Sequence, residues 1–156
     1  MTKRIRNRDF FFLIILIVVM VGLPWSIQAY DDHHWRTEIT AGAKVFNLTA
    51  HSELGWLPGK VHGYDAIALH SKSRPAQSLT LEVNKGDLVV LKITSSDVVH
   101  GFSLKDFGIF IEDGIRPGKV VLVSFKADKA GTFAWTCSII CGDQHKSMQG
   151  TLVVRA

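Results

Sequence analysis

Residues that bind soft metals are gathered in one short stretch near the end of the chain. Cys137, Cys141, His145 and Met148 lie within twelve residues, and His100 lies 37 residues before the first cysteine. Thiolate and thioether sulfur suit Cu(I), and imidazole suits both oxidation states of copper, so the mixture favours a copper ion that changes oxidation state. The chemistry predicted is therefore transfer of single electrons. A mononuclear blue copper site uses only one cysteine, whereas this stretch has two.

Two other interpretations of the cysteine pair stay open at the level of the sequence. Cysteines four residues apart in an oxidising compartment can form a disulfide, and a Cys-x3-Cys pair followed by histidine can hold zinc. Neither interpretation requires Met148 or the turn that ends at His100. The complete set of residues therefore favours copper.

The spacing resembles that of the CuA domain of cytochrome c oxidase subunit II, and also that of nitrous oxide reductase, across residues 79–154. His100 and the sequence C-x3-C-x3-H-x2-M of residues 137–148 fall on the ligand positions of that family. Residues 85–87, 117–118 and 128–133 also match its turns. The resemblance implies a cupredoxin fold with a dinuclear copper centre.

The resemblance also implies a role for each ligand. Both cysteine thiolates would bridge two copper ions, of which one is completed by His100 and Met148. The other would bind His145 and the main-chain carbonyl oxygen of Ile139. Sharing one unpaired electron through two sulfurs spreads the charge change over both metals, so little geometry changes on reduction. Many oxidases have a magnesium-binding glutamate where Ile139 stands here, so we expect no magnesium site.

Length, composition and charge limit the remaining possibilities. Residues beyond the N-terminal segment number about 125, which is one ordinary domain. Apolar residues make up 47% of the chain, so disorder is not expected. The formal charge is +4, but the first nine residues contribute +3 of it through four basic residues and Asp9. The remainder is nearly neutral, and no nucleic-acid partner is expected.

The N-terminus carries a membrane signal. Residues 10–23 form an unbroken apolar run that continues less cleanly to Ala29, with four basic residues before it. The positive-inside rule predicts that the basic tail stays in the cytoplasm and that the domain is exported. Twenty residues suffice for a membrane span, but the pattern also fits a cleavable signal peptide. In either case we expect the copper domain on the periplasmic or extracellular side of the cytoplasmic membrane.

Strand patterns dominate the exported part. Five segments are rich in β-formers or alternate between apolar and polar residues: 79–83, 88–94, 120–125, 132–135 and 150–154. Short strands separated by glycine and aspartate turns predict an all-β, antiparallel Greek-key β-sandwich with one N-terminal helix. The predicted organisation is an anchor or signal peptide over 1–29, a linker with a first strand over 30–77, and a CuA-binding core over 78–156.

Other histidines carry weaker signals. His51, His62 and His70 could form a second metal site, but histidines without fixed spacing are more often surface residues. The His-His-Trp stretch at 33–35 could bind metal, although a linker or a membrane interface suits it better.

We interpret the chain as a relay that passes electrons from a cytochrome c-like donor to a haem-copper oxidase catalytic subunit. The chain itself would be a non-catalytic electron-entry subunit of an oxidoreductase complex. The sequence therefore leaves open whether it counts as an enzyme. The alternatives are a free-standing CuA carrier or copper-handling protein, and a structural sandwich with a disulfide.

The aromatic cluster through which members of the family accept electrons is not recognisable in this chain. Residues 105, 106, 143 and 146 are expected to form a mixed-charge rim around the contact patch.

Overall fold

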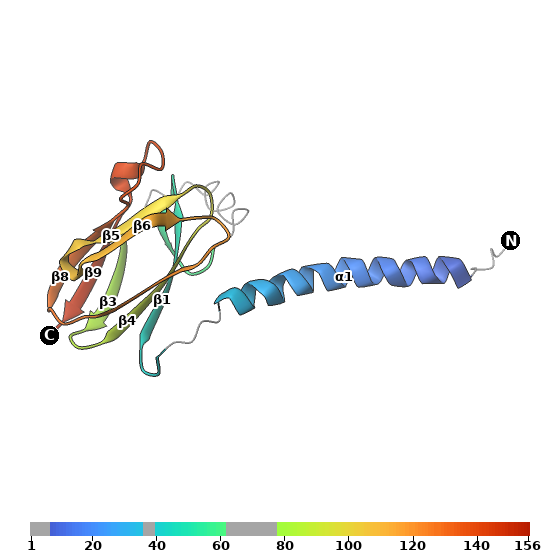
Figure 1. Ribbon diagram of the computed structural model, residues 1–156, viewed down its shortest axis with the longest axis horizontal. Helices are drawn as coiled ribbons and strands as arrows, with labels where there is room; N and C mark the ends of the chain where they lie inside the picture. Colours follow the sequence, from blue (N-terminus) through green and yellow to red (C-terminus); the bar gives the residue numbers. More distant parts are fainter. Residues whose placement is uncertain (1–6, 36–39, 62–77) are drawn as a thin grey trace. The chain divides into compact units, whose positions relative to one another are not determined.

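The computed structural model describes residues 7–35, 40–61 and 78–156 of the chain, which divides into two compact units (Figure 1). The unit Met1–Glu38 contains helix α1 (Asn7–Trp35). The unit Ile39–Ala156 contains strands β1 to β9 and all the predicted metal ligands.

Helix α1 has the length and composition of a membrane span. The segment Asn7–Tyr30 has 24 residues and contains an 18-residue stretch with a mean hydropathy of 2.7. At about 1.5 Å per residue it is roughly 36 Å long, which exceeds the ~30 Å hydrocarbon core of a bilayer. Its apolar side chains are exposed, and a helix that is apolar on every side is suited to lipid. A signal sequence near an N-terminus has the same properties.

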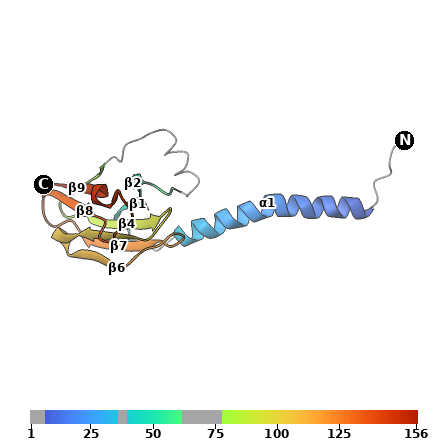
Figure 2. The same ribbon diagram turned by 90° about the horizontal axis from the view of Figure 1, so that it is seen from above.

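The second unit is a sandwich of two β-sheets (Figures 1 and 2). One sheet has the order β2-β1-β4-β7 and the other the order β3-β9-β8-β5-β6. The strands of the first sheet are β1 (Lys44–His51), β2 (Gly55–Pro58), β4 (Leu88–Ser95) and β7 (Val121–Lys126). Those of the second are β3 (Leu79–Asn84), β5 (His100–Leu104), β6 (Ile109–Ile115), β8 (Gly131–Thr136) and β9 (Gln149–Arg155). Two 3-10 turns, η1 (Lys105–Phe107) and η2 (His145–Ser147), lie in connections.

The prediction of an all-β, cupredoxin-like sandwich with one N-terminal helix is confirmed. The expectation that every pairing is antiparallel was wrong at two places. Strand β1 is parallel to β4, and β3 is parallel to β9. The first of these arises because the chain crosses to the other sheet through β3 before it returns as β4, so no hairpin joins the two neighbours.

The core lies between the sheets and is built by alternation along the strands. Leu81 and Val83 of β3 are buried opposite Leu152 and Val154 of β9, while residues between them are more exposed. Each such fully buried aliphatic side chain contributes roughly 1.5–3 kcal/mol relative to an exposed one.

An aromatic contact joins the two sheets below the predicted metal ligands. Trp56 of β2 meets Phe102 of β5 edge to face, with 5.6 Å between ring centroids. Phe102 in turn stacks on Trp135 of β8 at 6.3 Å. All three rings are at most 2% exposed. These large rigid side chains fix the positions of β5, which begins with His100, and of β8, which is followed by Cys137.

One end of the sandwich gathers the predicted ligands. The loop between β8 and β9 projects from that end with η2 (red in Figure 1). Its two ends are held together, because Thr136 pairs with Gln149 and the Cys137 N–H donates to the Met148 carbonyl at 3.1 Å. Strand β5 begins at the same end with His100.

Candidate metal centre

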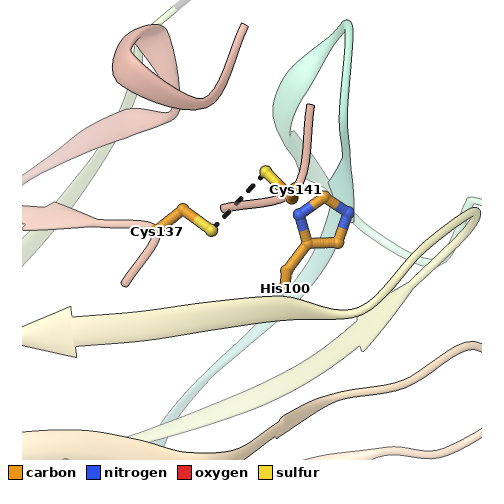
Figure 3. A group of neighbouring side chains, drawn as sticks. All are labelled: His100, Cys137 and Cys141. Carbon is orange, nitrogen blue, oxygen red and sulfur yellow. Dashed lines mark hydrogen bonds between the residues drawn. The ribbon is translucent and has the colours of Figure 1, made fainter. Parts of the chain in front are cut away.

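The two cysteine sulfurs form the centre of the site. Cys137 Sγ and Cys141 Sγ are 3.7 Å apart, and both cysteines are free thiols (Figure 3). A disulfide requires a sulfur separation of about 2.05 Å. The structure therefore shows a pair of thiols that face each other, and the disulfide interpretation is not supported.

His100 extends from the start of β5 toward this pair. Its side chain is fully buried, and its ligand atom lies within 4.8 Å of both sulfurs (Figure 3). The Nε2 atom is 2.8 Å from Asp97 Oδ1, whereas Nδ1 is buried without a hydrogen-bond partner. A buried polar atom without a partner is costly. A metal ion held by the thiolates would satisfy Nδ1.

The remaining predicted ligands also converge on the sulfurs. Cys137 Sγ lies 3.1 Å from the Ile139 carbonyl oxygen. Cys141 Sγ lies 3.2 Å from Met148 Sδ and 3.7 Å from His145 Nδ1. The structure thus brings together all six residues that the sequence predicted.

Backbone groups around the sulfurs hold the loop close to β5. The Gly101 N–H donates to Cys137 Sγ at 3.3 Å. A Cβ atom at Gly101 would lie 2.2 Å from Ser138 Oγ and 2.7 Å from the Ile139 nitrogen. The glycine therefore permits the close approach of β5 to the cysteine loop.

The two thiols differ in acidity because they share one site. Burial alone would raise the pKa of Cys137, but the neighbouring His100 ring and hydrogen bonds with backbone groups outweigh it and lower the pKa to about 6. Burial and the negative charge of Cys137 raise the pKa of Cys141 to about 12. The pair therefore loses its first proton easily and its second only to a strong competitor such as a metal ion.

Asp97 supports His100 and was missed as a site residue by the sequence analysis. Burial alone would raise the pKa of Asp97, yet hydrogen bonds from His100 and Ser52 hold it well below its usual value. Burial lowers the pKa of His100, but contacts with Asp97 and Cys137 outweigh this effect and raise it. A carboxylate on the outer nitrogen of a metal-binding histidine fixes the ring and its tautomer. The position of Asp97 three residues before a predicted ligand was the available signal.

The predicted charged rim needs correction. Lys105 and Asp106 lie in η1, which follows the far end of β5. Lys129, in the connection before β8, donates its Nζ to the Asp106 carbonyl at 2.8 Å. Because β8 ends where the cysteine loop starts, this contact lies at the opposite end of the sandwich. Asp143 and Lys146, both exposed, remain on the cysteine loop.

The other histidines do not join this site. His51 is partly buried and lies 3.9 Å from the carboxylate of Asp97 through Nδ1. His62 and His70 fall outside the described residues. His33 is exposed, and the side chain of His34 is likewise outside the description. Within residues 7–35, 40–61 and 78–156, the cluster of His100 with the two cysteines is the one group of three such metal-binding side chains.

The donor set fits copper. An ion about 2.3 Å from each thiolate, the usual metal–sulfur distance in zinc sites, fits on either side of the line that joins sulfurs 3.7 Å apart. Zinc sites use cysteine, histidine and carboxylate ligands, whereas a thioether favours Cu(I). Met148 Sδ, 3.2 Å from Cys141 Sγ, therefore favours copper over zinc.

A Greek-key sandwich with sulfur and imidazole donors on the loop between its last two strands defines a copper domain of the cupredoxin class. Residues 69–156, more than half of the chain, match the family described as cytochrome c oxidase subunit II, periplasmic domain. The chain belongs to this family. Its cofactor is the dinuclear copper centre CuA, and it is an electron-transfer domain.

Individual relatives agree with this assignment. Cytochrome c oxidase subunit 2 of Thermus thermophilus is 39% identical over 75 residues, which are 48% of this chain and 54% of that protein. Nitrous-oxide reductase of Pseudomonas fluorescens is 36% identical over 85 residues, which are 51% of this chain and 13% of that protein. The chain therefore spans about half the length, or less, of the curated relatives it matches.

A solved structure supports the fold. The crystal structure of the periplasmic domain of subunit II of cytochrome oxidase from Bradyrhizobium japonicum superposes with a TM-score of 0.50 at 22% identity. The superposition covers 75% of this chain and 87% of that chain.

Proposed function

We propose that six residues of this chain hold the dinuclear copper centre. Cys137 and Cys141 would hold both ions, His100 and Met148 would complete one of them, and His145 and the Ile139 carbonyl oxygen would complete the other. The convergence of all these donors on the two sulfurs is the observation that carries the proposal. Contacts of 3.1–3.7 Å connect the two sulfurs to each other and to the donor atoms of Ile139, His145 and Met148. The ligand atom of His100 lies within 4.8 Å of both sulfurs.

The protein contributes a rigid and largely dry cage. His100 and Met148 are at most 1% exposed, and Cys137 is 6% exposed. Fixed donors and the absence of water reduce the rearrangement that accompanies a change of oxidation state. When bound, the copper pair supplies the chemistry of accepting and releasing one electron.

The proposed role is an electron relay between two partners. The donor is a cytochrome c-like protein, and the acceptor is the catalytic subunit of a haem-copper oxidase. Family membership supports this assignment. The exposure of the loop supports it too, because Ile140, next to Cys141, is 87% exposed and His145 is only partly buried. Electrons would cross the surface near this loop.

The proposed location is the cytoplasmic membrane, with the copper domain on the periplasmic or extracellular side. Helix α1 would be retained as an anchor, since its 24-residue apolar segment is long enough to span a bilayer. The family description as a periplasmic domain supports export of the copper domain.

A gentle detergent purification through a C-terminal tag tests the relay. We expect haem absorbance to co-purify with the chain, and we expect a reduced cytochrome c to reduce the copper rapidly. The variant Ile140→Lys, which adds a charge at an exposed position beside the site without replacing a ligand, should slow reduction while copper content stays unchanged. Recovery of the chain alone with rapid reduction by the cytochrome would instead indicate a free-standing carrier.

A further inference from the structure

The turn between β1 and β2 lies directly beside the loop that leads to His100. Strands β1 and β4 are parallel neighbours with Ala50 opposite Ser95, so the segments that follow them leave the sheet together. The Ser96 N–H donates to the Ala50 carbonyl at 3.0 Å and ties the two segments at their base. The turn is therefore held within reach of Asp97.

His51 closes this turn through its ring. The Nδ1 atom accepts hydrogen bonds from the N–H groups of Glu53 at 3.2 Å and Leu54 at 3.3 Å. The side chain is 15% exposed. An acceptor that bonds the N–H two residues further along is the arrangement that asparagine and aspartate create in an Asx turn. His51 fulfils the same role with an imidazole nitrogen.

The closed turn directs the Ser52 N–H at Asp97, the carboxylate that supports the proposed ligand His100. The Ser52 N–H donates to Asp97 Oδ2 at 2.8 Å. The other oxygen, Asp97 Oδ1, lies 2.8 Å from His100 Nε2. Both carboxylate oxygens are thus engaged, Oδ2 by the turn and Oδ1 by His100 and, at 3.4 Å, by the Ser95 hydroxyl. Rotation of the carboxylate would break both contacts.

The turn also lies close to the cysteine loop. A Cβ atom at Gly142 would lie 3.6 Å from Ser52 Cβ, which is ordinary contact distance. Gly142 follows Cys141 directly. Ser52 therefore borders the site on two sides, at the support of His100 and at the loop that carries the second thiol.

We propose that His51 is a positioning residue of the copper centre, which acts by holding the Ser52 N–H on Asp97 and so fixes the ring of His100. The inference rests on the proposed ligand role of His100. A direct ion pair between His51 and Asp97 is not the mechanism, because Nδ1 is 3.9 Å from the carboxylate and already accepts two hydrogen bonds. The effect passes through the backbone of the turn.

Two substitutions at residue 51 separate this role from general stabilisation. His51→Ala removes the acceptor, whereas His51→Asn supplies a side-chain carbonyl that accepts the same N–H groups. Val83→Ala is the matched control, because Val83 is buried in β3 and is not part of the turn. All variants are prepared in the full chain.

The first measurement is made without copper, by NMR of the Ser52 amide. His51→Ala should increase its hydrogen exchange and shift its proton resonance upfield, because the bond to Asp97 is lost. His51→Asn should restore both properties, and Val83→Ala should leave the resonance position unchanged. An unchanged Ser52 amide in His51→Ala would overturn the proposal.

The second measurement is made on the copper-loaded chain. Loss of a residue that hydrogen-bonds a metal ligand lowers metal affinity 10–100-fold. His51 acts on such a residue, Asp97, and not on the ligand directly, so we expect about threefold to tenfold weaker copper binding in His51→Ala. The paramagnetically shifted resonances of the His100 ring should move in the same variant and return in His51→Asn. Wild-type resonances and affinity in His51→Ala, or failure of His51→Asn to rescue, would contradict the role. A wild-type chain without a dinuclear spectrum would refute the ligand proposal itself.

Discussion

At the scale of single residues, the two thiolates and the thioether have different proposed roles in metal binding. Cys137 and Cys141 are proposed to contact both metals, whereas Met148 contacts one. Met148 is nevertheless buried, so its side chain also fills the base of the loop. A change at Met148 should therefore tune the centre, while a change at either cysteine should dismantle it.

Met148→Leu should retain both copper ions and shift the reduction potential, because leucine conserves the volume and removes a weak ligand. Cys141→Ser should abolish the spectrum of a shared electron, because only a thiolate bridges the metals. Copper analysis, EPR and a redox titration of both variants provide the test. Equal loss of copper in the two variants would show that Met148 is more than a weak ligand.

Copper affinity should depend on pH in a direction set by the cysteine pair. The pKa of Cys141 is raised to about 12, so copper must displace its proton at every lower pH. We therefore expect affinity to rise about tenfold per pH unit between pH 7 and 9. Below about pH 6 the slope should steepen, because Cys137 then also carries a proton.

Competition with a Cu(I) chelator over this pH range provides the measurement. Met148→Leu is the control, since a thioether carries no proton and the slope should stay the same. An affinity that does not change with pH would mean that the thiols are not the groups that bind copper.

At the scale of structural elements, β8 and β9 hold the cysteine loop from below. Trp135 of β8 is paired with Gly150 of β9. A Cβ atom at Gly150 would lie 2.1 Å from the Trp135 ring, so the ring rests directly on the glycine backbone. This contact fixes the separation of the strands immediately beneath the site.

Gly150→Val should destabilise the domain by about 3 kcal/mol, because the added side chain has to displace a buried ring. Trp135→Ala should be destabilising by itself, by about 3–5 kcal/mol. The double variant should be more stable than the sum of the two effects predicts, because each change makes room for the other. Chemical unfolding of the four proteins measures the coupling, and strict additivity would contradict the proposed contact.

The sequence predicted some elements better than others. Alternation identified β3 and β9, since Leu81, Val83, Leu152 and Val154 face the core in both pattern and structure. The parallel pairing of these strands was not predictable, because it depends on a connection between sheets rather than on a local turn. Strand β5 was also missed, since all five of its residues are buried and show no alternation.

The ligand positions were predicted more readily than their support. Cysteine, histidine and methionine at family spacing are visible in a sequence, whereas the contact of Ser52 with Asp97 joins residues 45 positions apart through a backbone N–H. Any residue except proline supplies such a group. The ring of His51 closes the turn by accepting from backbone N–H groups, which the sequence does not reveal either. His51 was therefore interpreted as a surface histidine.

At the scale of the whole molecule, α1 decides whether the copper domain is tethered. Intact mass spectrometry of the chain from membranes should give about 17.3 kDa, the mass of the full sequence. Ile17→Arg should reduce the fraction that resists an alkaline wash, because a charge near the centre of a span costs about 2.5–3.5 kcal/mol. Ala29→Arg, near the end of the segment, is the control. A mature chain that starts near residue 30 would show a cleaved signal peptide.

The central claim is that one chain holds two copper ions that share one electron through Cys137 and Cys141. The most direct test is the EPR spectrum of the oxidised, copper-loaded full chain, combined with copper analysis. We predict two ions per chain, one unpaired electron, and hyperfine splitting from two equivalent copper nuclei. One ion per chain with splitting from a single nucleus would contradict the account.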